Sequence, residues 1–523
     1  MPTFKEMFRE GKRDEIWEKY CGFLDLNIDE FMKIQERLLM EQIELLSSCE
    51  LGKMLMGNIK PKSIDEFREL IPLTTYDDYA DTLLNKKEEL LPQKPMYWIK
   101  TTWKGGEHPV KLAPYSESMV KEHAKAFIAS LILCTSKKRG DFKLAENDKF
   151  LYGMAPLPYL TGLAPYGLKE KITFDYLPTI EEAESMGFKE RNEKGFELGL
   201  RKGIDIFFGL SSVLVKIGES FSNEDKNGKS KMVIPSNFGM AYRLVNALIK
   251  KKLLKKTILP RDIWSMKGII CAGTDSSVFK EKIEYYWGIK PIEIYGGTEI
   301  AIAATETWSK DGLTFFPDVN FLEFIPEKYA IRDSNQKKLK TLLLNEIKAG
   351  ERYELVITKF KGGAFIRYRV GDIIECISLD DKKNGINIPQ IKFVDRVSNI
   401  IDIAGFTRIT KDTINNAINN SSLNVNNWVA RKEYIQNEPK LHIYLEMNET
   451  VPEDYVKEKL NMSLKKLDSD FESIDSLLGK DPLHITILRK GTFSKFEKMK
   501  NIALNPINPS ADEIQMLISI SNE

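Results

Sequence analysis

The chain of 523 residues is 42% hydrophobic and 10% aromatic, and it carries 77 basic against 76 acidic residues. A single hydrophobic core rarely serves a chain of this length, so we expect two or three domains. Because the charges balance, there is no overall field that would attract nucleic acid or an acidic lipid surface. These figures indicate a folded globular protein and argue against a nucleic-acid-binding one.

Cysteine and histidine usage and the apolar patterning narrow the class further. The five cysteines lie far apart without paired spacing, and no two of the four histidines lie within four residues of each other. This usage is typical of a reducing compartment and argues against a disulfide framework or a histidine metal cluster. The N-terminus is charged throughout, unlike a signal peptide, and no apolar run reaches the roughly 18 residues of a membrane span. We therefore expect a cytoplasmic protein.

One segment, residues 241–256 (AYRLVNALIKKKLLKK), has the composition of a basic amphipathic helix that could lie on a membrane. Its apolar face is also what any surface helix presents to its own protein. We adopt the second interpretation and expect no membrane partner.

The predicted elements alternate between helices and strands. Residues 14–56 read as helical, because apolar positions recur there at intervals of three and four, and a short helix is expected to end at Leu84. Beyond it, short apolar runs separated by turns predict strands, with helical patterns between them. The strands are expected within 149–160, 266–273, 290–297, 321–326 and 353–360, and helices at 181–187 and 240–256. This alternation predicts an α/β fold.

The best domain boundary lies between residues 380 and 400, where the polar turn DDKKNG precedes a strand that leads away from it. A second α/β pattern follows, with strand-like 440–447, helix-like 452–467 and strand-like 482–491. Together they make a βαβ module of about 120 residues, which is large enough to fold as a unit. We predict a large domain over residues 1–394 and a small one over 395–523.

Three short segments carry the residue types of a nucleotide site. The first, IKTTWKGGEHPVKLAPYS (residues 99–116), offers threonine hydroxyls, two glycines and a lysine, as a phosphate-cradling turn requires. Trp103 stands in its middle, where such loops usually carry a small residue. An ordinary hairpin is the alternative interpretation.

In the second segment, IEIYGGTE, a predicted strand over residues 292–294 leads into two glycines, Thr298 and Glu299. Ligands of open α/β sheets lie beyond the carboxyl ends of strands, so Thr298 can donate to a phosphate and Glu299 can hold Mg²⁺. The alternative is a glycine-rich turn with Glu299 at the start of a helix, where the dipole favours an acid.

In the third segment, FIRYRVGD, a predicted strand ends at Gly371 and Asp372. A carboxylate at a strand turn can accept both hydroxyls of a ribose. The alternative is a β-turn without a ligand. Arg367 and Arg369 share one face of the strand, where they either reach a phosphate or line a solvated surface.

In this order the three segments resemble the adenylate-forming superfamily, to which luciferases and acyl-CoA synthetases belong. Within it the chain looks most like the auxin-responsive acyl-acid amido synthetase (Gretchen Hagen) family and its bacterial relatives. The supporting phrases are FRELIPLTTYDDYADTL, AGTDSSVFKEKIEYYWG, IYGGTE, FLEFIPE, FIRYRVGD and DPLHITILRKGTF. The resemblance implies a large N-terminal domain with mixed sheets and helices and a small, mobile α/β C-terminal domain.

The resemblance also implies roles for individual residues. Those implied in nucleotide binding are Thr101, Thr102, Gly105, Gly106 and Lys111 at the phosphate loop, Gly297 and Thr298 before the magnesium-binding Glu299, Asp372 at the ribose, and Arg396 at the inter-domain hinge. Those implied in catalysis are Glu299, Arg408, which stands where relatives carry a lysine facing the phosphates, and Lys495. ATP and Mg²⁺ are the implied cofactors.

Two departures from the family pattern stand out. The loop reads KTTWKGG where the family has a sequence close to TSGTSGG, so two hydroxyls and one glycine are replaced. The C-terminal segment in which relatives carry a lysine for adenylation is not found, and Lys495, Lys498 or Lys500 would have to substitute for it. Loss of one positioned donor typically costs about a hundred- to a thousandfold in rate.

The implied reaction joins a small carboxylic acid to an amine, for which we expect an amino acid, through an acyl-adenylate formed from ATP. An acyl-CoA ligase on the same scaffold is the first alternative, since no residue fixes the acceptor. The second is a nucleotide-binding pseudoenzyme, against which the presence of both Glu299 and Asp372 argues. The apolar segment over residues 153–167 is the expected lining of the acid pocket, although core packing explains its tyrosines equally well.

Overall fold

The computed structural model describes residues 3–101, 110–169, 171–226, 237–254, 257–273, 276–332, 337–396, 400–403, 407–436, 438–468, 470–472, 474, 481–500 and 504–523. These residues form two compact units. The larger unit comprises the described residues of Met1–Thr102, Val110–Ala272 and Phe279–Val397, and the smaller consists mainly of those of Ser398–Glu523.

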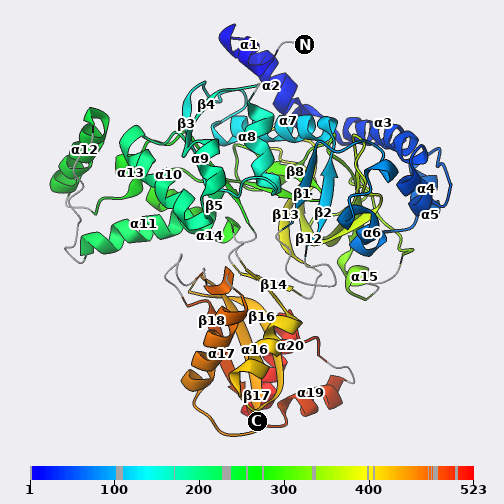
Figure 1. Ribbon diagram of the computed structural model, residues 1–523, viewed down its shortest axis with the longest axis vertical. Coiled ribbons are helices and arrows are strands. Elements are labelled where there is room, and N and C mark those ends of the chain that lie inside the picture. Colours follow the sequence, from blue (N-terminus) through cyan, green and yellow to red (C-terminus); the bar gives the residue numbers. More distant parts are fainter. Residues whose placement is uncertain are drawn as a thin grey trace. The chain divides into compact units, whose positions relative to one another are not determined.

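The larger unit is built around a sheet of 11 strands in the order β10-β11-β12-β13-β9-β8-β7-β6-β5-β3-β4 (Figure 1). The strands are β3 Asp148–Tyr152, β4 Phe174–Leu177, β5 Ile206–Leu210, β6 Gly268–Ala272, β7 Ile292–Gly297, β8 Ala301–Glu306, β9 Leu313–Phe315, β10 Asn320–Pro326, β11 Arg352–Lys359, β12 Tyr368–Ser378 and β13 Gln390–Arg396. From β7 to β4 the pairs are parallel, and from β7 to β10 they are antiparallel. β5 is buried along its whole length (IFFGL), the continuous apolar pattern of a parallel strand covered on both faces.

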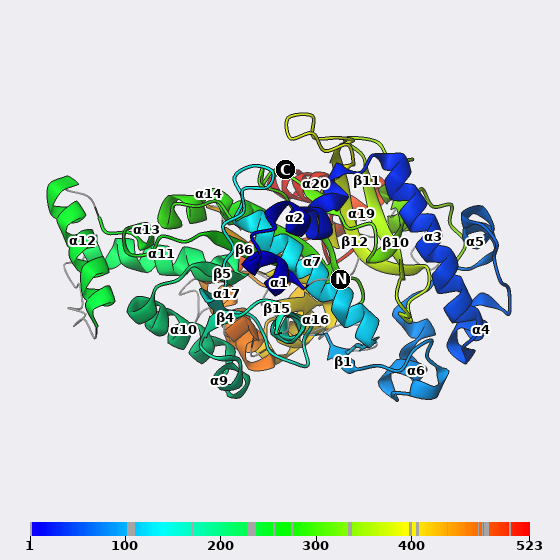
Figure 2. The same ribbon diagram turned by 90° about the horizontal axis from the view of Figure 1, so that it is seen from above.

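The larger unit contains helices in addition to this sheet. They are α1 Phe4–Arg9, α2 Arg13–Cys21, α3 Ile28–Ser47, α4 Glu50–Met56, α5 Ile64–Leu70, α6 Ala80–Leu84, α7 Glu117–Cys134, α8 Leu163–Leu168, α9 Ile180–Ser185, α10 Phe188–Lys202, α11 Ser211–Lys226, α12 Phe238–Leu254, α13 Pro260–Ile263, α14 Ser276–Trp287 and α15 Glu327–Arg332. Figure 2 shows α7 across the sheet, beside α2. Its sequence is apolar on nearly every side (AKAFIASLILC), so it lies buried against β6, β7 and β8.

A separate two-stranded hairpin in the larger unit bears on the site. β1 (Tyr97–Lys100) pairs antiparallel with β2 (Leu112–Tyr115). The bridge between Lys100 and Tyr159 sets the hairpin against the proline-rich segment that precedes α8.

The smaller unit, coloured from yellow through orange to red in Figure 1, contains a three-stranded sheet in the order β16-β17-β18 and a two-stranded sheet, β14-β15. Its elements are β14 Ile400–Ile403, β15 Thr407–Thr410, α16 Lys411–Ser421, β16 Val425–Ile435, β17 Glu438–Met447, α17 Glu453–Leu467, β18 Leu483–Leu488, α19 Thr492–Lys500 and α20 Ala511–Asn522. α17 joins the parallel strands β17 and β18, so the predicted βαβ module is confirmed.

The predicted α/β fold is confirmed by this arrangement of sheets and helices. The helical prediction for residues 14–56 is correct in kind, with breaks between α2, α3 and α4. All five cysteines are free and buried. Within the described part of the chain, no helix combines the length and the apolar character needed to cross a membrane.

Candidate functional site

The segment YGGTE lies where the large sheet changes character. β7 pairs in parallel with β6 and antiparallel with β8. Thr298, Glu299 and Ile300 form the turn between β7 and β8. The alternative that Glu299 begins a helix is therefore wrong, because a strand follows. Open sheets bind ligands beyond the carboxyl ends of their strands, at points where the strand order changes, so this turn is well placed for a ligand.

Two tyrosines connect this segment to YRVGD. The Tyr295 hydroxyl donates to Asp372 Oδ2 at 2.8 Å, and the Tyr368 hydroxyl donates to Glu299 Oε1 at 3.3 Å. In each motif the tyrosine stands four residues before the acid, and the tyrosine of each binds the acid of the other. Burial and the nearby Glu299 charge raise the pKa of Tyr368 well above its ordinary value, so the phenol keeps its proton and remains a donor.

Lys111 brings a cation to the same place. Its Nζ lies 3.8 Å from Glu299 Oε1, 3.3 Å from the Tyr368 hydroxyl oxygen and 5.1 Å from the ring centroid of Tyr76. The side chains of Lys111 and Glu299 are 17% and 16% exposed, so the pair is shielded from bulk water yet reachable. A carboxylate and a cation in this setting suit a phosphate and its counter-ion.

Lys111 also marks one end of the candidate phosphate loop. The Thr101 N–H donates to the Lys111 carbonyl at 2.9 Å, and the Lys111 N–H donates to Thr101 Oγ1 at 3.3 Å. The loop is therefore the connection of the β1–β2 hairpin, with its two ends held together. Thr102, Gly105 and Gly106 lie outside the described residues.

The backbone around the turn is closely packed. A Cβ atom added to Gly296 would lie 2.4 Å from the Ala301 carbonyl oxygen, so only glycine fits there. Gly297 ends β7, and Thr298 is buried, with 9% of it exposed. The Tyr115 hydroxyl donates to the Thr298 carbonyl at 2.8 Å. This packing fixes the direction in which the chain enters the turn.

Two buried side chains hold the far end of the turn. The Ile300 carbonyl, next to Glu299, accepts from Asn320 Nδ2 at 2.9 Å and from Lys359 Nζ at 3.3 Å. Burial lowers the pKa of Lys359 to about 7, although the charges of Glu122 and Asp318 oppose that shift. The Lys359 ammonium is thus buried with the Ile300 carbonyl as its hydrogen-bond acceptor.

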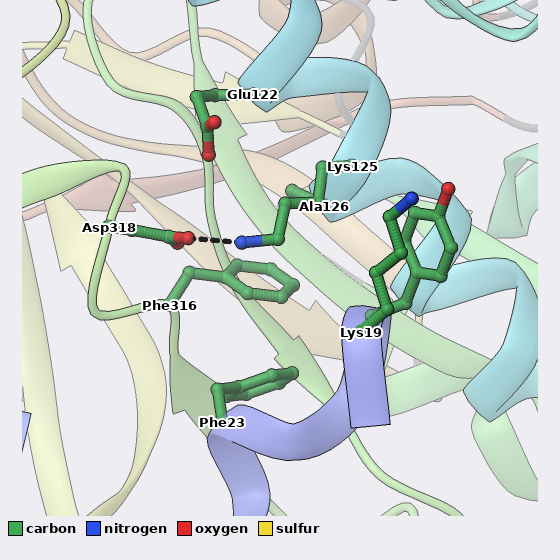
Figure 3. Close-up of a pocket in the computed structure, with 8 residues that line it drawn as sticks. Lys19, Phe23, Glu122, Lys125, Ala126, Phe316 and Asp318 are labelled. Carbon is green, nitrogen blue, oxygen red and sulfur yellow. Dashed lines mark hydrogen bonds and ion pairs between the residues drawn. The ribbon is translucent and has the colours of Figure 1, made fainter. Parts of the chain in front are cut away.

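The charges near Lys359 border a small cavity. Figure 3 shows Lys125 Nζ and Asp318 Oδ2, which are 2.5 Å apart, with Glu122 close by. The cavity of about 40 Å³ is lined by Lys19, Tyr20, Phe23, Glu122, Lys125, Ala126, Phe316 and Asp318. That volume has room for two or three waters, so it is too small for a nucleotide or an organic acid. We assign Glu122, Lys125 and Asp318 a structural role near the turn.

Asp372 lies inside β12, not at the end of a strand as predicted. The pairing of β12 with β11 shifts in register next to this point, and Gly371 has φ +77°, a left-handed conformation that favours glycine. β-Bulges of this kind re-aim side chains near functional sites. Here the Asp372 carboxylate meets the Tyr295 hydroxyl.

Arg367 and Arg369 form buried ion pairs, so neither predicted alternative is found. Arg367 donates to Glu323 from Nε at 3.1 Å and from Nη2 at 2.7 Å. Arg369 donates to Glu354 in the same two-pronged way, at 3.0 and 2.5 Å. Both arginines are buried, with 2% and 8% exposed. Each guanidinium fork is matched by a carboxylate of the antiparallel half of the sheet, which gives these residues a structural role.

The remaining predicted residues lie at the end of the larger unit and in the smaller one. Arg396 ends β13, where its Cα is paired with that of Asp372. In the smaller unit, Arg408 lies on β15 with its Nε 3.4 Å from Asp402 Oδ2, and Lys495 is exposed on α19. The catalytic roles of Arg408 and Lys495 stay predictions.

Comparison with protein-family models matches two parts of the chain. Residues 23–152 match the GH3 family N-terminal domain, and residues 313–396 match the GH3 family central domain. The two matched segments are therefore GH3 family domains. The resemblance inferred from the motifs is thereby confirmed, while a bacterial type of member stays a prediction. The first match includes the candidate phosphate loop and the second includes Asp372, with Glu299 between them.

Individual relatives and structures agree with the GH3 assignment. The indole-3-acetic acid-amido synthetase GH3.10 of Arabidopsis thaliana is 20% identical over 93% of this chain and 92% of its own length. Other plant relatives match shorter stretches, one of them over 42% of this chain and 40% of its own length. The solved structure of AtGH3.15 acyl acid amido synthetase in complex with 2,4-DB is 14% identical over 93% of both chains, with a TM-score of 0.52. An open conformation of 2-hydroxyisobutyryl-CoA ligase is 14% identical over 87% of both chains, with a TM-score of 0.50. These likenesses show the adenylate-forming fold.

The GH3 family implies ATP and Mg²⁺, and the donor set at the turn fits both. Among the described residues, no group of three or more histidine, cysteine, aspartate and glutamate side chains could hold a metal. A magnesium ion on nucleotide phosphates needs only one or two carboxylates, because phosphate oxygens and water complete its shell. Glu299 beside Lys111 supplies one shielded carboxylate and a cation for the phosphates. The site thus fits a magnesium nucleotide rather than an autonomous metal centre.

Sequence reasoning missed Tyr295, Tyr368 and Lys359. The tyrosines carried a readable signal, since each stands four residues before a candidate acid in a GH3 motif. Lys359 carried none, because a lysine at the end of a strand is ordinarily solvated. Its burial follows from packing between distant segments.

Proposed function

We propose that this GH3 chain is an ATP-dependent ligase that activates a small carboxylic acid as an acyl-adenylate and transfers the acyl group to an amino acid. The observation that carries the proposal is the reciprocal pairing of YGGTE with YRVGD, which connects Asp372 to Tyr295 and connects Glu299 to Tyr368 and Lys111. The relative that aligns along nearly its whole length supports it, since it is an indole-3-acetic acid-amido synthetase.

The proposed reaction has two displacement steps. In the first, a carboxylate oxygen of the acid attacks the α-phosphorus of ATP, a P–O bond forms, and the bond to pyrophosphate breaks. In the second, the amine nitrogen attacks the acyl carbon, the C–N bond forms, AMP leaves with the electrons of the C–O bond, and the amine gives up a proton. The protein contributes chiefly by positioning the reactants and offsetting charge.

Glu299, Lys111 and Asp372 would have separate roles in this reaction. Glu299, aligned by Tyr368, would hold Mg²⁺, and Lys111 would face the nucleotide phosphates. Bound Mg²⁺ would supply charge to offset that on the phosphate oxygens. Asp372, fixed by Tyr295, would accept the ribose hydroxyls.

The other predicted residues complete the proposal. Thr101, Thr102, Gly105 and Gly106 would cradle phosphates in the hairpin loop, Gly297 and Thr298 would approach the nucleotide at the turn, and Arg396, Arg408 and Lys495 would act at the hinge and in the small domain. In this proposal residues 1–394 bind nucleotide and acid, and residues 395–523 move between the two steps.

The test is ATP–pyrophosphate exchange with a panel of aryl, indole and short-chain acids. Exchange that depends on one acid supports adenylation and identifies the first substrate. Mass spectrometry after adding amino acids or CoA then separates an amide product from a thioester, and a thioester would favour the acyl-CoA ligase instead. Exchange with no acid, while calorimetry still detects ATP binding, would contradict the ligase and favour the pseudoenzyme.

A substitution ties the activity to the turn. Glu299→Ala is expected to abolish magnesium-dependent exchange and leave the fold intact, because the carboxylate is partly exposed and outside the core. Glu449→Ala, an exposed acid of the smaller unit, is the matched control and should keep full activity. Full exchange by the Glu299 variant would refute the site assignment.

A further inference from the structure

α12 (Phe238–Leu254) exposes an unusual amount of apolar surface. Six of its large side chains are exposed: Phe238 by 88%, Tyr242 by 62%, Val245 by 51%, Leu248 by 56%, Ile249 by 49% and Leu253 by 76%. By comparison α17 exposes three, namely Tyr455, Met462 and Leu467. Both views place α12 at the outer edge of the larger unit, at the far left (Figures 1 and 2). An apolar patch of this kind on a protein surface marks an interaction site.

The exposed stripe is not the face that attaches the helix to its own protein. α12 packs against α10 and α13, and the residues that it buries there include Met240 and Ala247. Arg243 Nη2 donates to the carbonyls of Leu200 and Arg201 at 2.5 and 2.9 Å. At 100° per residue, Met240 and Ala247 lie opposite the exposed stripe. The helix is thus apolar on two opposite sides, and the described residues of the larger unit cover one of them.

The charge of the helix indicates what covers the second side. Residues 238–256 contain Arg243 and five lysines, Lys250, Lys251, Lys252, Lys255 and Lys256, and no acidic residue. Lys250 Nζ lies 3.8 Å from Asp262 Oδ1, a partly exposed contact of little strength. The stretch therefore keeps a strong positive charge at the C-terminal end of an apolar stripe.

An anionic lipid surface matches this combination better than a second copy of the chain. Apolar and aromatic side chains along one face, with lysines clustered on the same helix, are the composition of a helix that lies in the plane of a membrane surface. Pairing with a second copy would bury the two stripes together, but the basic stretch would find no acid on the partner helix. Each lysine near an anionic membrane strengthens binding about fivefold.

We propose that α12 seats the larger unit on an anionic lipid surface, with the stripe of Phe238, Tyr242, Val245, Ile249 and Leu253 in the acyl boundary and the exposed Lys250 among the headgroups. This is contact with a membrane surface, not a span. It replaces the sequence-based expectation of no membrane partner, which took the apolar face for that of an ordinary surface helix. The proposal does not rest on the ligase activity.

The experiment is flotation of the full chain with phosphatidylcholine vesicles that contain or lack phosphatidylserine. The wild-type chain is expected to float with the phosphatidylserine vesicles, to stay behind with phosphatidylcholine alone, and to dissociate as salt is raised. Phe238→Ser with Leu253→Ser should weaken binding at least about tenfold. Lys250→Gln should weaken it about fivefold.

Matched controls separate the helix from general effects. Tyr455→Ser with Met462→Ser removes exposed apolar side chains from α17, and Lys382→Gln with Lys383→Gln removes an exposed lysine pair elsewhere. Both should bind vesicles as the wild-type chain does. Since Phe238, Lys250 and Leu253 are exposed, thermal unfolding should be unchanged in their variants.

Three results would overturn the proposal. One is that the wild-type chain fails to float with phosphatidylserine vesicles. Another is equal, salt-independent flotation with both kinds of vesicle, which would exclude recognition of anionic headgroups. The third is self-association in analytical ultracentrifugation that the Phe238 and Leu253 substitutions abolish, without vesicle binding, which would assign the stripe to a second copy of the chain.

Discussion

Two buried lysines in the larger unit lie in contrasting settings. Lys280, on α14, has its Nζ 3.1 Å from Glu293 Oε1 and also hydrogen-bonded to Glu306. Lys359, at the end of β11, has the Ile300 carbonyl as its hydrogen-bond partner among the described residues. One ammonium touches two carboxylates, and the other touches a backbone oxygen next to the candidate magnesium ligand.

The contacts give the two ammonium groups pKa shifts of opposite sign. Burial disfavours the charge on Lys280, but Glu306 and Glu293 outweigh it and raise the pKa of Lys280. Burial lowers the pKa of Lys359 to about 7, because its carboxylates lie further away. Burial alone therefore does not separate a structural lysine from a positioning one, whereas the atoms that the ammonium touches do. The first should matter for folding and the second for the site.

The largest effect is expected from breaking the carboxylate-bound group. Lys280→Met leaves Glu293 and Glu306 without their cation, and removal of one partner from a buried ion pair costs about 3–5 kcal/mol. Burial raises the pKa of Glu306 to about 7, so this carboxyl is protonated below neutral pH and the loss should grow as pH rises above about 7. Urea unfolding at several pH values measures it.

A partly exposed neighbour on α14 is the control for that loss. Lys282 Nζ lies 3.6 Å from Glu219 Oε1, and its side chain is 34% exposed. Lys282→Met should cost less than about 1 kcal/mol. Equal losses for Lys280→Met and Lys282→Met would show that the buried contacts contribute nothing special.

Lys359→Met should affect activity more than stability. Methionine keeps the apolar stem but cannot donate to the Ile300 carbonyl, so this carbonyl next to Glu299 loses one of its two side-chain donors. We expect kcat to fall about tenfold to a hundredfold, with the free energy of unfolding unchanged or higher because a disfavoured charge is removed. Acid-dependent exchange and urea unfolding measure the two. A loss of stability as large as that of Lys280→Met would erase the contrast between the two lysines.

His123, near Lys359, is expected to make the stability of the protein depend on pH. It is 3% exposed, and neither ring nitrogen has a hydrogen-bond partner in the described residues. Burial, with the charge of Lys359, lowers the pKa of His123 to about 3. As pH falls below about 6.5, the histidine is therefore protonated in the unfolded chain but not in the folded one. The free energy of unfolding decreases accordingly.

His123→Leu should remove this loss on the acid side. Between pH 6.5 and about pH 5 the wild-type protein should lose about 2 kcal/mol more than the variant, because each unit of pKa difference is worth about 1.4 kcal/mol. Urea unfolding over that range measures the difference. Parallel pH curves for both proteins would mean that the histidine is protonated in the fold.

The fold and the two candidate acids could be predicted because their signals are local. Apolar runs mark β7 and β12, and the glycines before Glu299 and Asp372 mark a backbone that needs space. The fate of Arg367 could not be predicted, because its partner Glu323 lies on another strand. The same holds for the exposed side of α12, since periodicity shows that a helix has an apolar face but not which neighbour covers it.

The smallest effect is expected from Tyr295→Phe, which tests the contact with Asp372 apart from the buried contacts that hold the turn. Tyr295→Phe removes the hydroxyl that donates to Asp372 Oδ2 at 2.8 Å and changes nothing else in shape. A hydrogen bond to a charged group contributes about 1.5–3 kcal/mol at most, and water can replace part of it, so we expect the KM for ATP to rise about five- to tenfold. The kcat should hardly change, because the turn with Glu299 keeps its buried supports. Tyr455→Phe, at an exposed tyrosine of α17, is the control.

Comparing KM and kcat between the two variants distinguishes the role of Asp372 from that of Lys359. A change in KM alone for Tyr295→Phe and in kcat for Lys359→Met would place Asp372 in nucleotide binding and Lys359 in holding the turn during the reaction. Equal changes in both constants for both variants would mean that the two motifs act as one rigid body. Asp372 would then owe its effect to packing with Tyr295, and its proposed contact with the ribose would lose its support.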